Sequence, residues 1–203
     1  MATLAEVRGR VRRLLEDTDA VTPLWSDAEL GEWLGTAARE YGLRRPREGT
    51  VGVAAVAGQS VYALPGEVRR VLRVESPPGW PVPRRAAGAG AGPGLAQSWA
   101  FFGGALEFGT PPGGAIVARF RGLYPWPTVD GPTVDGATVE LPDEGVDVVV
   151  LGAALLALGR REVAAAKRRG GQAGVGLALE VLRRMYAESL ARCRVARGGT
   201  VGE

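Results

Sequence analysis

Apolar residues recur at helical spacing near the start of the chain. These positions are Leu4, Val7, Val11 and Leu14. Thr3 and Glu6 have the spacing of a capping box, in which each side chain accepts a hydrogen bond from the backbone N–H of the other residue. The pattern therefore predicts a first helix over about residues 3–16, with arginines on its other face.

Residues 17–34 indicate where this helix ends and the next one begins. Ser26 is a favourable N-cap residue, and Glu29 completes a second capping box. Trp25 before the cap and Leu30 after it suit a hydrophobic staple, which fixes the angle at which the chain enters a helix. We therefore expect a two-helix corner that is built on Trp25, Ser26, Asp27, Glu29 and Leu30.

The second helix is expected from Asp27 to about Tyr41, with an apolar stripe along one side. Gly42 and Pro46 are expected to end it, since proline cannot continue a helix interior. Asp17 closes the preceding helix, where it either contributes to the electrostatics of the helix end or pairs with an arginine. The connection between the two helices is longer than the tight turn of a DNA-binding helix-turn-helix.

Between about residues 50 and 122 the pattern changes to short β-prone runs that are separated by glycine and proline. The runs span 50–56, 60–65, 68–75, 98–102, 105–108 and 115–120. Gly58-Gln59 is expected to join the first two runs as a hairpin, and Gly103-Gly104 to join two later ones. In the last run, apolar residues alternate with others, which predicts a sheet with one wetter face.

Two further helices are expected in the last third of the chain. Asp143 can cap a helix over about residues 144–168, whose first half is apolar on nearly every side and belongs in a core. A glycine-rich connection at 170–176 separates it from a fourth helix that reaches about Arg197. The apolar positions of the fourth helix are Leu179, Leu182, Tyr186, Leu190 and Cys193.

The elements together predict an α+β fold. It consists of a bundle of about four helices, two N-terminal and two C-terminal, with a β-rich insertion between them. The expected segments are an N-terminal helical pair at 1–48, the insertion with its long loops at 49–142, a C-terminal helical pair at 143–197 and a flexible tail at 198–203.

Composition argues against a catalytic or metal centre. The chain has no histidine and one cysteine, Cys193, so the usual general base, a disulfide framework and the common metal ligand sets are excluded. The glycine-rich segments at 88–94 and 170–176 do not have the context of a phosphate-binding loop. We therefore expect no enzymatic activity, no cofactor and no metal.

Two acidic pairs, Asp143 with Glu144 and Asp130 with Asp135, are expected to be solvated loop charge, because too few ligands surround them for calcium. The second pair lies in a PTVDG sequence that occurs twice in tandem at 127–136, which we interpret as a duplicated surface loop.

No membrane association is expected. The longest apolar stretch, at 148–158, is shorter than the ~20 residues of a membrane-spanning helix. Arginines interrupt the apolar pattern near the N-terminus, which is not typical of a signal peptide.

Basic residues are concentrated at 160–197, a segment that contains ten basic residues and three glutamates. A solvated helical face, an interface with acidic partner residues and a nucleic-acid-binding surface all remain open. Of the 25 basic residues in the chain only Lys167 is a lysine, and the planar arginine fork suits interface pairing, although a GC-rich genome biases codons the same way. The candidate subunit interface comprises Arg160, Arg161, Arg168, Arg169, Arg183 and Arg184.

Several segments, taken in order, resemble the head-to-tail adaptor (connector) proteins of tailed bacteriophages. The resemblance rests on the D-T-D and W-S-D-A-E-L sequences of the helix corner, Ala37-Ala38-x-x-Tyr41, V-A-G-Q-S-V-Y-A-L-P at 56–65, and a late helix rich in alanine and leucine. The β-rich insertion is similar to that of the elaborated adaptors, including the tubular adaptors of short-tailed phages.

The resemblance implies a non-enzymatic virion protein of the neck region that is assembled in the host bacterial cytoplasm. Such adaptors form homo-oligomeric, typically twelve-fold rings that dock beneath the portal protein and extend the DNA channel towards a tail or stopper protein, so genomic DNA passes through the lumen. Their C-terminal segment contacts the portal. In this chain the corresponding candidate contact residues are Val195, Ala196, Arg197, Thr200 and Val201.

Overall fold

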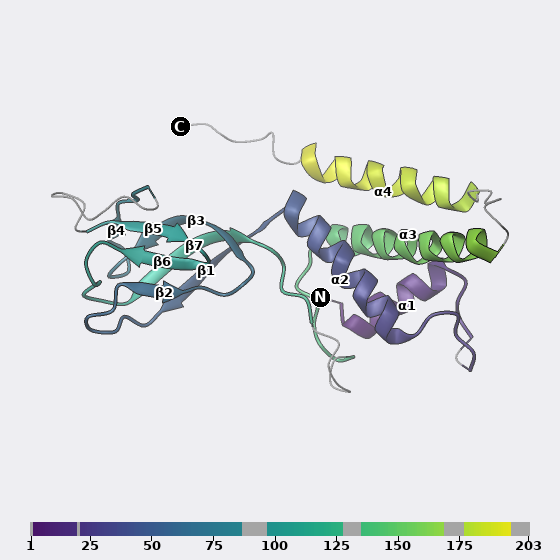
Figure 1. Ribbon diagram of the computed structural model, residues 1–203, viewed down its shortest axis with the longest axis horizontal. Coiled ribbons are helices and arrows are strands. Elements are labelled where there is room, and N and C mark those ends of the chain that lie inside the picture. Colours follow the sequence, from purple (N-terminus) through teal and green to yellow (C-terminus); the bar gives the residue numbers. More distant parts are fainter. Residues whose placement is uncertain (1, 20, 87–96, 128–134, 169–176, 196–203) are drawn as a thin grey trace. The chain divides into compact units, whose positions relative to one another are not determined.

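The protein has the expected α+β fold, with four helices and two antiparallel sheets (Figure 1). The computed structural model describes residues 2–19, 21–86, 97–127, 135–168 and 177–195. The chain forms two compact units. A helical unit contains Met1–Arg45 and Tyr124–Glu203, and a β unit contains Pro46–Leu123.

The first two helices begin at the predicted capping boxes. Helix α1 spans Leu4–Leu14 and helix α2 spans Asp27–Arg44, and in both boxes the two reciprocal hydrogen bonds are present. The predicted end of α2 at Gly42 is wrong, because Gly42 is a buried residue inside the helix. Burial of its last turns against the helical core outweighs the low helix propensity of glycine, and the helix ends only before Pro46.

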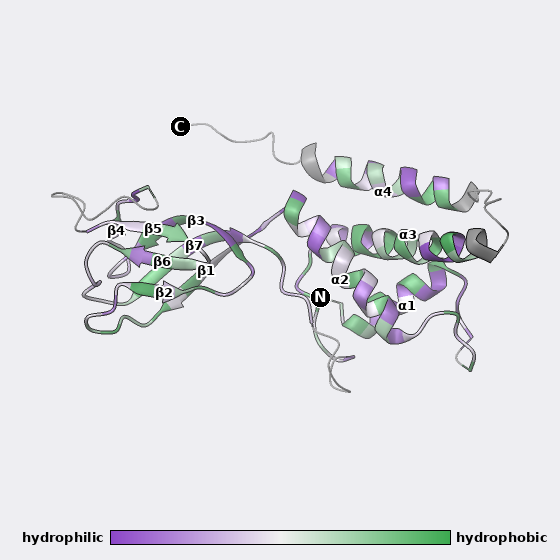
Figure 2. Cartoon of the chain, in the orientation of Figure 1, coloured by the Kyte–Doolittle hydropathy of each residue, from purple (hydrophilic) through white to green (hydrophobic). Residues whose placement is uncertain are grey.

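The other two helices are α3 (Asp143–Arg168) and α4 (Leu177–Val195). Asp143 is the first helical residue of α3 rather than its cap, since the carbonyl of Pro142 already accepts from Gly145 and Val146. Figure 2 shows hydrophobic residues along much of α3 and hydrophilic ones towards its C-terminal end. The predicted core positions of α4 that the structure describes are buried, namely Leu179, Leu182, Tyr186 and Leu190, whereas the side chain of Cys193 lies outside the described residues.

The segment before α3 packs with the helices. Thr138 forms a β-bridge with Thr3, and the N–H of Val139 donates to the carbonyl of Ala2 at 2.9 Å. Val139 is fully buried in the helical core. The β unit therefore ends at Leu123, whereas the expected boundary is at residue 142. Backbone pairing with the N-terminus holds part of the intervening segment against the helices.

The β unit contains two antiparallel sheets. The four-stranded sheet has the order β1-β7-β3-β4, with β1 at Arg47–Val53, β7 at Ile116–Gly122, β3 at Val68–Glu75 and β4 at Pro81–Val82. The three-stranded sheet has the order β2-β6-β5, with β2 at Val61–Ala63, β6 at Ala105–Phe108 and β5 at Trp99–Phe102. Inward-facing residues from both sheets form one core cluster.

The alternation predicted for the last strand is confirmed, since Ile116, Ala118 and Phe120 are buried and Arg119 is exposed. The Gly103-Gly104 hairpin is also confirmed. Both glycines have positive φ, 58° and 82°, as a two-residue turn between β5 and β6 requires.

The hairpin predicted at Gly58-Gln59 is wrong. A turn does form there, with the N–H of Gln59 donating to the carbonyl of Val56. However, β1 pairs with β7 and β2 pairs with β6, so the chain changes sheets at this turn. Local turn residues do not distinguish a hairpin from a crossing between sheets, because the pairing partners are distant in sequence.

Candidate functional site

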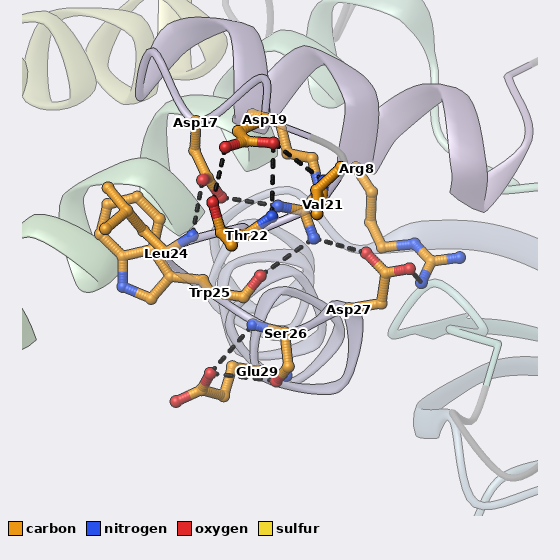
Figure 3. A network of polar contacts seen from close by, with 11 residues as sticks. Arg8, Asp17, Asp19, Val21, Thr22, Leu24, Trp25, Ser26, Asp27 and Glu29 are labelled. Carbon is orange, nitrogen blue, oxygen red and sulfur yellow. Dashed lines mark hydrogen bonds and ion pairs between the residues drawn. The ribbon is translucent and has the colours of Figure 1, made fainter.

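A network of polar contacts joins α1 to α2 (Figure 3). Arg12 takes part in it through both of its terminal nitrogens. One of its terminal nitrogens donates to Asp17 Oδ2 at 2.6 Å. The other donates to the carbonyl of Trp25 at 3.0 Å and to Asp27 Oδ1 at 2.7 Å. One guanidinium group therefore holds the end of the first helix, the connection and the start of the second helix.

Asp17 is the buried carboxylate of this network, with 3% of its surface exposed. Besides the ion pair with Arg12, its Oδ1 accepts a hydrogen bond from the N–H of Leu24 at 2.7 Å. Pairing with an arginine, one of the two alternatives for Asp17, is thus the observed one. A buried carboxylate that lost this partner would be uncompensated, which is strongly destabilising.

Three other carboxylates of the corner have pKa values below their ordinary range. Hydrogen bonds from the Thr22 side chain and from backbone N–H groups lower the pKa of Asp19. The hydrogen bond from Arg12 lowers the pKa of Asp27, and the backbone and hydroxyl groups of Ser26 lower that of Glu29. The corner is therefore arranged around ionised carboxylates.

Arg8 is a buried cation that the sequence pattern did not single out, with 7% of its surface exposed. It forms ion pairs with Asp27, at 3.3 Å, and with Asp135. Asp135 belongs to the second PTVDG copy and is exposed, as expected for solvated loop charge, but it also pairs with Arg8; Asp130 lies outside the described residues. Glu144 is likewise exposed and pairs with Arg45, but Asp143 and Glu144 lie in the first turn of α3 rather than in a loop.

The apolar side of the corner is buried. Trp25 and Leu30, the predicted staple pair, both belong to the helical core, and Trp25 meets Trp33 edge to face with ring centroids 6.4 Å apart. The Arg160 guanidinium lies over the Trp33 ring at 6.0 Å, within the range of a cation–π interaction. The corner is thereby joined to the C-terminal part of α3.

Arg160 and Arg161 border an open hollow of about 280 Å³ beside this corner. Its other lining residues are Leu24, Trp25, Glu29 and Ala164. Both arginines are exposed, and among the described residues neither has a carboxylate within ion-pair distance. These two predicted interface residues are therefore exposed cations without a carboxylate partner in the described ranges, although Arg160 also contacts the Trp33 ring.

The other predicted interface arginines differ from this pair. On α4, Arg184 pairs with Glu188 at 2.9 Å and Arg183 lies 4.0 Å from Glu180. The side chain of Arg168 and all of Arg169 lie outside the described residues, as do the candidate portal-contact residues Ala196, Arg197, Thr200 and Val201 and the side chain of Val195.

Helix α4 is fixed to α2 by a hydrogen bond that the sequence did not predict. The hydroxyl of Tyr186 donates to Glu40 Oε2 at 2.9 Å. Burial, followed by this hydrogen bond and the negative charge of Glu40, raises the pKa of Tyr186 well above its ordinary value. Gly152 of α3 lies against Tyr186 and Ala37, where an added Cβ would collide with both side chains.

Neither a metal centre nor a membrane segment is visible in the described parts of the chain. Within residues 2–19, 21–86, 97–127, 135–168 and 177–195, no three potential metal-ligating side chains come together. No helix in these ranges combines the length and apolar character that crossing a bilayer requires.

Comparisons with known proteins give a family for the chain. Residues 2–198 match the SU10 adaptor protein family, so the match includes both the helical unit and the β unit. No curated protein matches the chain. The match agrees with the resemblance to phage head-to-tail adaptors, and an adaptor family implies a structural rather than an enzymatic role. The chain therefore belongs to the SU10 adaptor protein family.

Proposed function

We propose that this chain is a subunit of the head-to-tail adaptor ring, which docks on the portal protein and extends the DNA channel towards the tail. The observation that carries the proposal is the family match over residues 2–198, which covers the helical corner, the β unit and the C-terminal helices. The protein is then a component of the virion neck, with the portal and a tail or stopper protein as its partners.

A closed ring needs two different complementary faces on each subunit. The hollow beside Arg160 and Arg161 is suited to be one of them, because it combines two exposed cations that form no ion pair among the described residues with the exposed side chain of Leu24. Interfaces are enriched in arginine, and rim charges set the encounter and register of the partners. We assign the neighbouring subunit to this hollow and the portal to the C-terminal residues from Val195 onwards.

The alternative function, nucleic-acid binding through the basic C-terminal helices, has less support. Arg183, Arg184 and Arg192 each lie within 4.0 Å of a glutamate on the same helix. The helical unit as a whole contains 17 basic and 18 acidic residues, so it has no net positive charge to attract phosphates.

Mass photometry of the purified chain, alone and with the portal protein of the same phage, tests the proposal. We expect a ring-sized species that forms with, or docks on, the portal. Arg160→Glu with Arg161→Glu should abolish the ring while the circular dichroism spectrum stays unchanged.

The matched control is Arg39→Glu, a charge reversal at an exposed position of α2, which should assemble normally. A chain that stays monomeric and ignores the portal would contradict the proposal. Normal assembly of the double variant would overturn only the assignment of the hollow.

A further inference from the structure

The net positive charge of the chain is located in the β unit. This unit contains eight arginines and four glutamates and has neither lysine nor aspartate, whereas basic and acidic residues nearly cancel in the helical unit. The formal charge of +3 therefore arises from the smaller unit, although the densest basic run in the sequence is at 160–197.

Five of these eight arginines lie on the outer face of the four-stranded sheet. The buried face of β7 packs in the core, which turns Arg119 and Arg121 outwards. In the pairing of β7 with β3, Arg121 is directly opposite Arg70 and Arg119 is directly opposite Arg73. Two pairs of like charges thus form a block of four guanidinium groups on neighbouring strands.

Bulges in β3 enlarge this outer face. The register shifts between Val68 and Arg70 and again between Val71 and Arg73. A bulge places two residues of one strand opposite a single residue of its partner. Arg69 and Leu72, the extra residues, are exposed together with Arg70 and Arg73. The basic sheet face is therefore defined by Arg69, Arg70, Arg73, Arg119 and Arg121.

Two carboxylates compensate this charge only in part. Arg121 pairs with Glu48 of β1 at 2.6 Å, and Arg73 pairs with Glu75 at 2.9 Å. In the part of the chain that the structure describes, Arg69, Arg70 and Arg119 have no carboxylate within 4 Å. Each directly opposed pair thus consists of one compensated and one uncompensated arginine.

Such an arrangement is unfavourable without a ligand. Side chains directly opposite each other in an antiparallel pair have Cβ atoms about 5 Å apart, and like charges there destabilise the sheet. This separation is below the screening length of about 8 Å at physiological salt, so the repulsion is only partly screened. An anion bound across the block would remove the repulsion.

The composition of the face favours phosphate over a protein partner. Protein interfaces have an apolar, often aromatic centre from which charged residues are depleted. Here charged groups occupy the centre, and the apolar side chains beside them are Leu72 and the half-buried Val117. Arginine forks bind phosphate oxygens bidentately, and a sheet face without a protruding helix contacts the backbone rather than the base edges.

We infer that the basic sheet face binds the phosphate backbone of duplex DNA without sequence preference. A ring subunit can conduct DNA without binding it, so this contact is a property separate from the adaptor role. Three uncompensated arginines neutralise few phosphates, so few counterions are released from the DNA. The contact is therefore weak and salt-dependent. Weak, sequence-independent phosphate contacts allow DNA to slide along a protein.

Fluorescence anisotropy of a labelled random duplex of about 20 base pairs, titrated with the full chain, tests the inference. Binding should appear at about 20 mM salt and fall with a log–log slope near −3, since each neutralised phosphate contributes about −0.9. Duplexes of different sequence should bind equally.

Variants identify the surface. Arg70→Glu with Arg119→Glu should weaken binding by at least about tenfold, as expected for the loss of two phosphate contacts at low salt. Glu48→Gln should strengthen binding severalfold, because it frees Arg121; a purely structural role for this face would not produce that gain. Arg183→Gln with Arg184→Gln on α4 is the matched control and should leave the affinity unchanged.

Thermal melting of each variant shows whether it is folded. The inference is overturned if the wild-type chain does not bind duplex DNA at low salt, or if the folded Arg70→Glu, Arg119→Glu variant binds as wild type does. It is also overturned if the duplex is ignored and this variant instead loses portal docking, which would assign the face to an acidic protein surface.

Discussion

The two units of this chain use arginine in different ways. In the helical unit, Arg8 and Arg12 are largely buried and join segments that are distant in sequence through carboxylates of the same chain. In the β unit, Arg70 and Arg119 lie on an exposed face and have no such partner among the described residues. The density of arginines along the sequence therefore does not show which arginines are structural and which are free to bind a partner. The positions of the carboxylates show it.

The largest effect should come from breaking the helix corner. Arg12→Ala leaves the buried carboxylate of Asp17 without its cation and removes the hydrogen bond to the carbonyl of Trp25. Loss of one partner from a buried ion pair costs about 3–5 kcal/mol, so the free energy of unfolding in urea should fall by that order. Arg13→Ala on the exposed side of α1 is the control and should change stability by less than about 0.5 kcal/mol. Equal effects of the two changes would show that the network does not hold the corner.

A smaller effect is expected where α4 joins α2. Tyr186→Phe removes the hydrogen bond to Glu40 and leaves a half-buried carboxylate with one partner fewer, which should cost about 1–2 kcal/mol. The pKa of Tyr186 is raised above its ordinary value of 10.0, so its stabilising contribution is present below pH 10 and is lost as the pH rises further.

Urea unfolding as a function of pH checks this relation. The wild-type chain should lose stability above pH 10 more steeply than Tyr186→Phe, because the unfolded tyrosine ionises first. Parallel curves for the two proteins above that pH would mean that the hydroxyl is not buried against Glu40.

The N-cap of α2 should contribute less again. Ser26→Ala removes the hydroxyl that accepts from the N–H of Glu29, and the loss of a cap costs about 1 kcal/mol. Thr36→Ala, which removes an exposed hydroxyl in the middle of the same helix, is the matched control and should have little effect. Thermal melting of both variants measures the difference, and a smaller loss for Ser26→Ala than for the control would argue against the capping box.

The smallest effect, of opposite sign, should come from the β unit. Arg119→Gln removes one member of a like-charged pair, so stability should stay the same or rise by up to about 0.5 kcal/mol at low salt. The same change at the buried Arg8 should destabilise the chain clearly, because Asp27 and Asp135 lose a cation. A loss of stability from Arg119→Gln would remove the contrast between the two units.

The features that could be predicted from the sequence are those set by neighbouring residues. The capping boxes at Thr3 and Ser26 and the two-glycine turn at Gly103-Gly104 involve groups within three residues of each other, so the spacing alone indicates them. The alternation along β7 is equally local, since successive side chains of a strand point to opposite faces.

The features that could not be predicted depend on pairing between distant residues. The ion pair of Arg8 with Asp135 joins residues more than a hundred positions apart, and the pairing of β1 with β7 crosses most of the β unit. The opposed arginines of β3 and β7 become visible only once the register of the two strands is known. For the same reason, the dense basic run at 160–197 could be recognised from the sequence, whereas the opposed arginines of the β unit could not.

The most direct test of the adaptor role is the location of the chain in the virion. Electron microscopy of purified phage particles, with the chain marked by a specific antibody, should show the label at the neck between the head and the tail. Mass spectrometry of the same particles should detect several copies of the chain per virion. Particles that contain the portal and an attached tail but lack this chain would contradict the account.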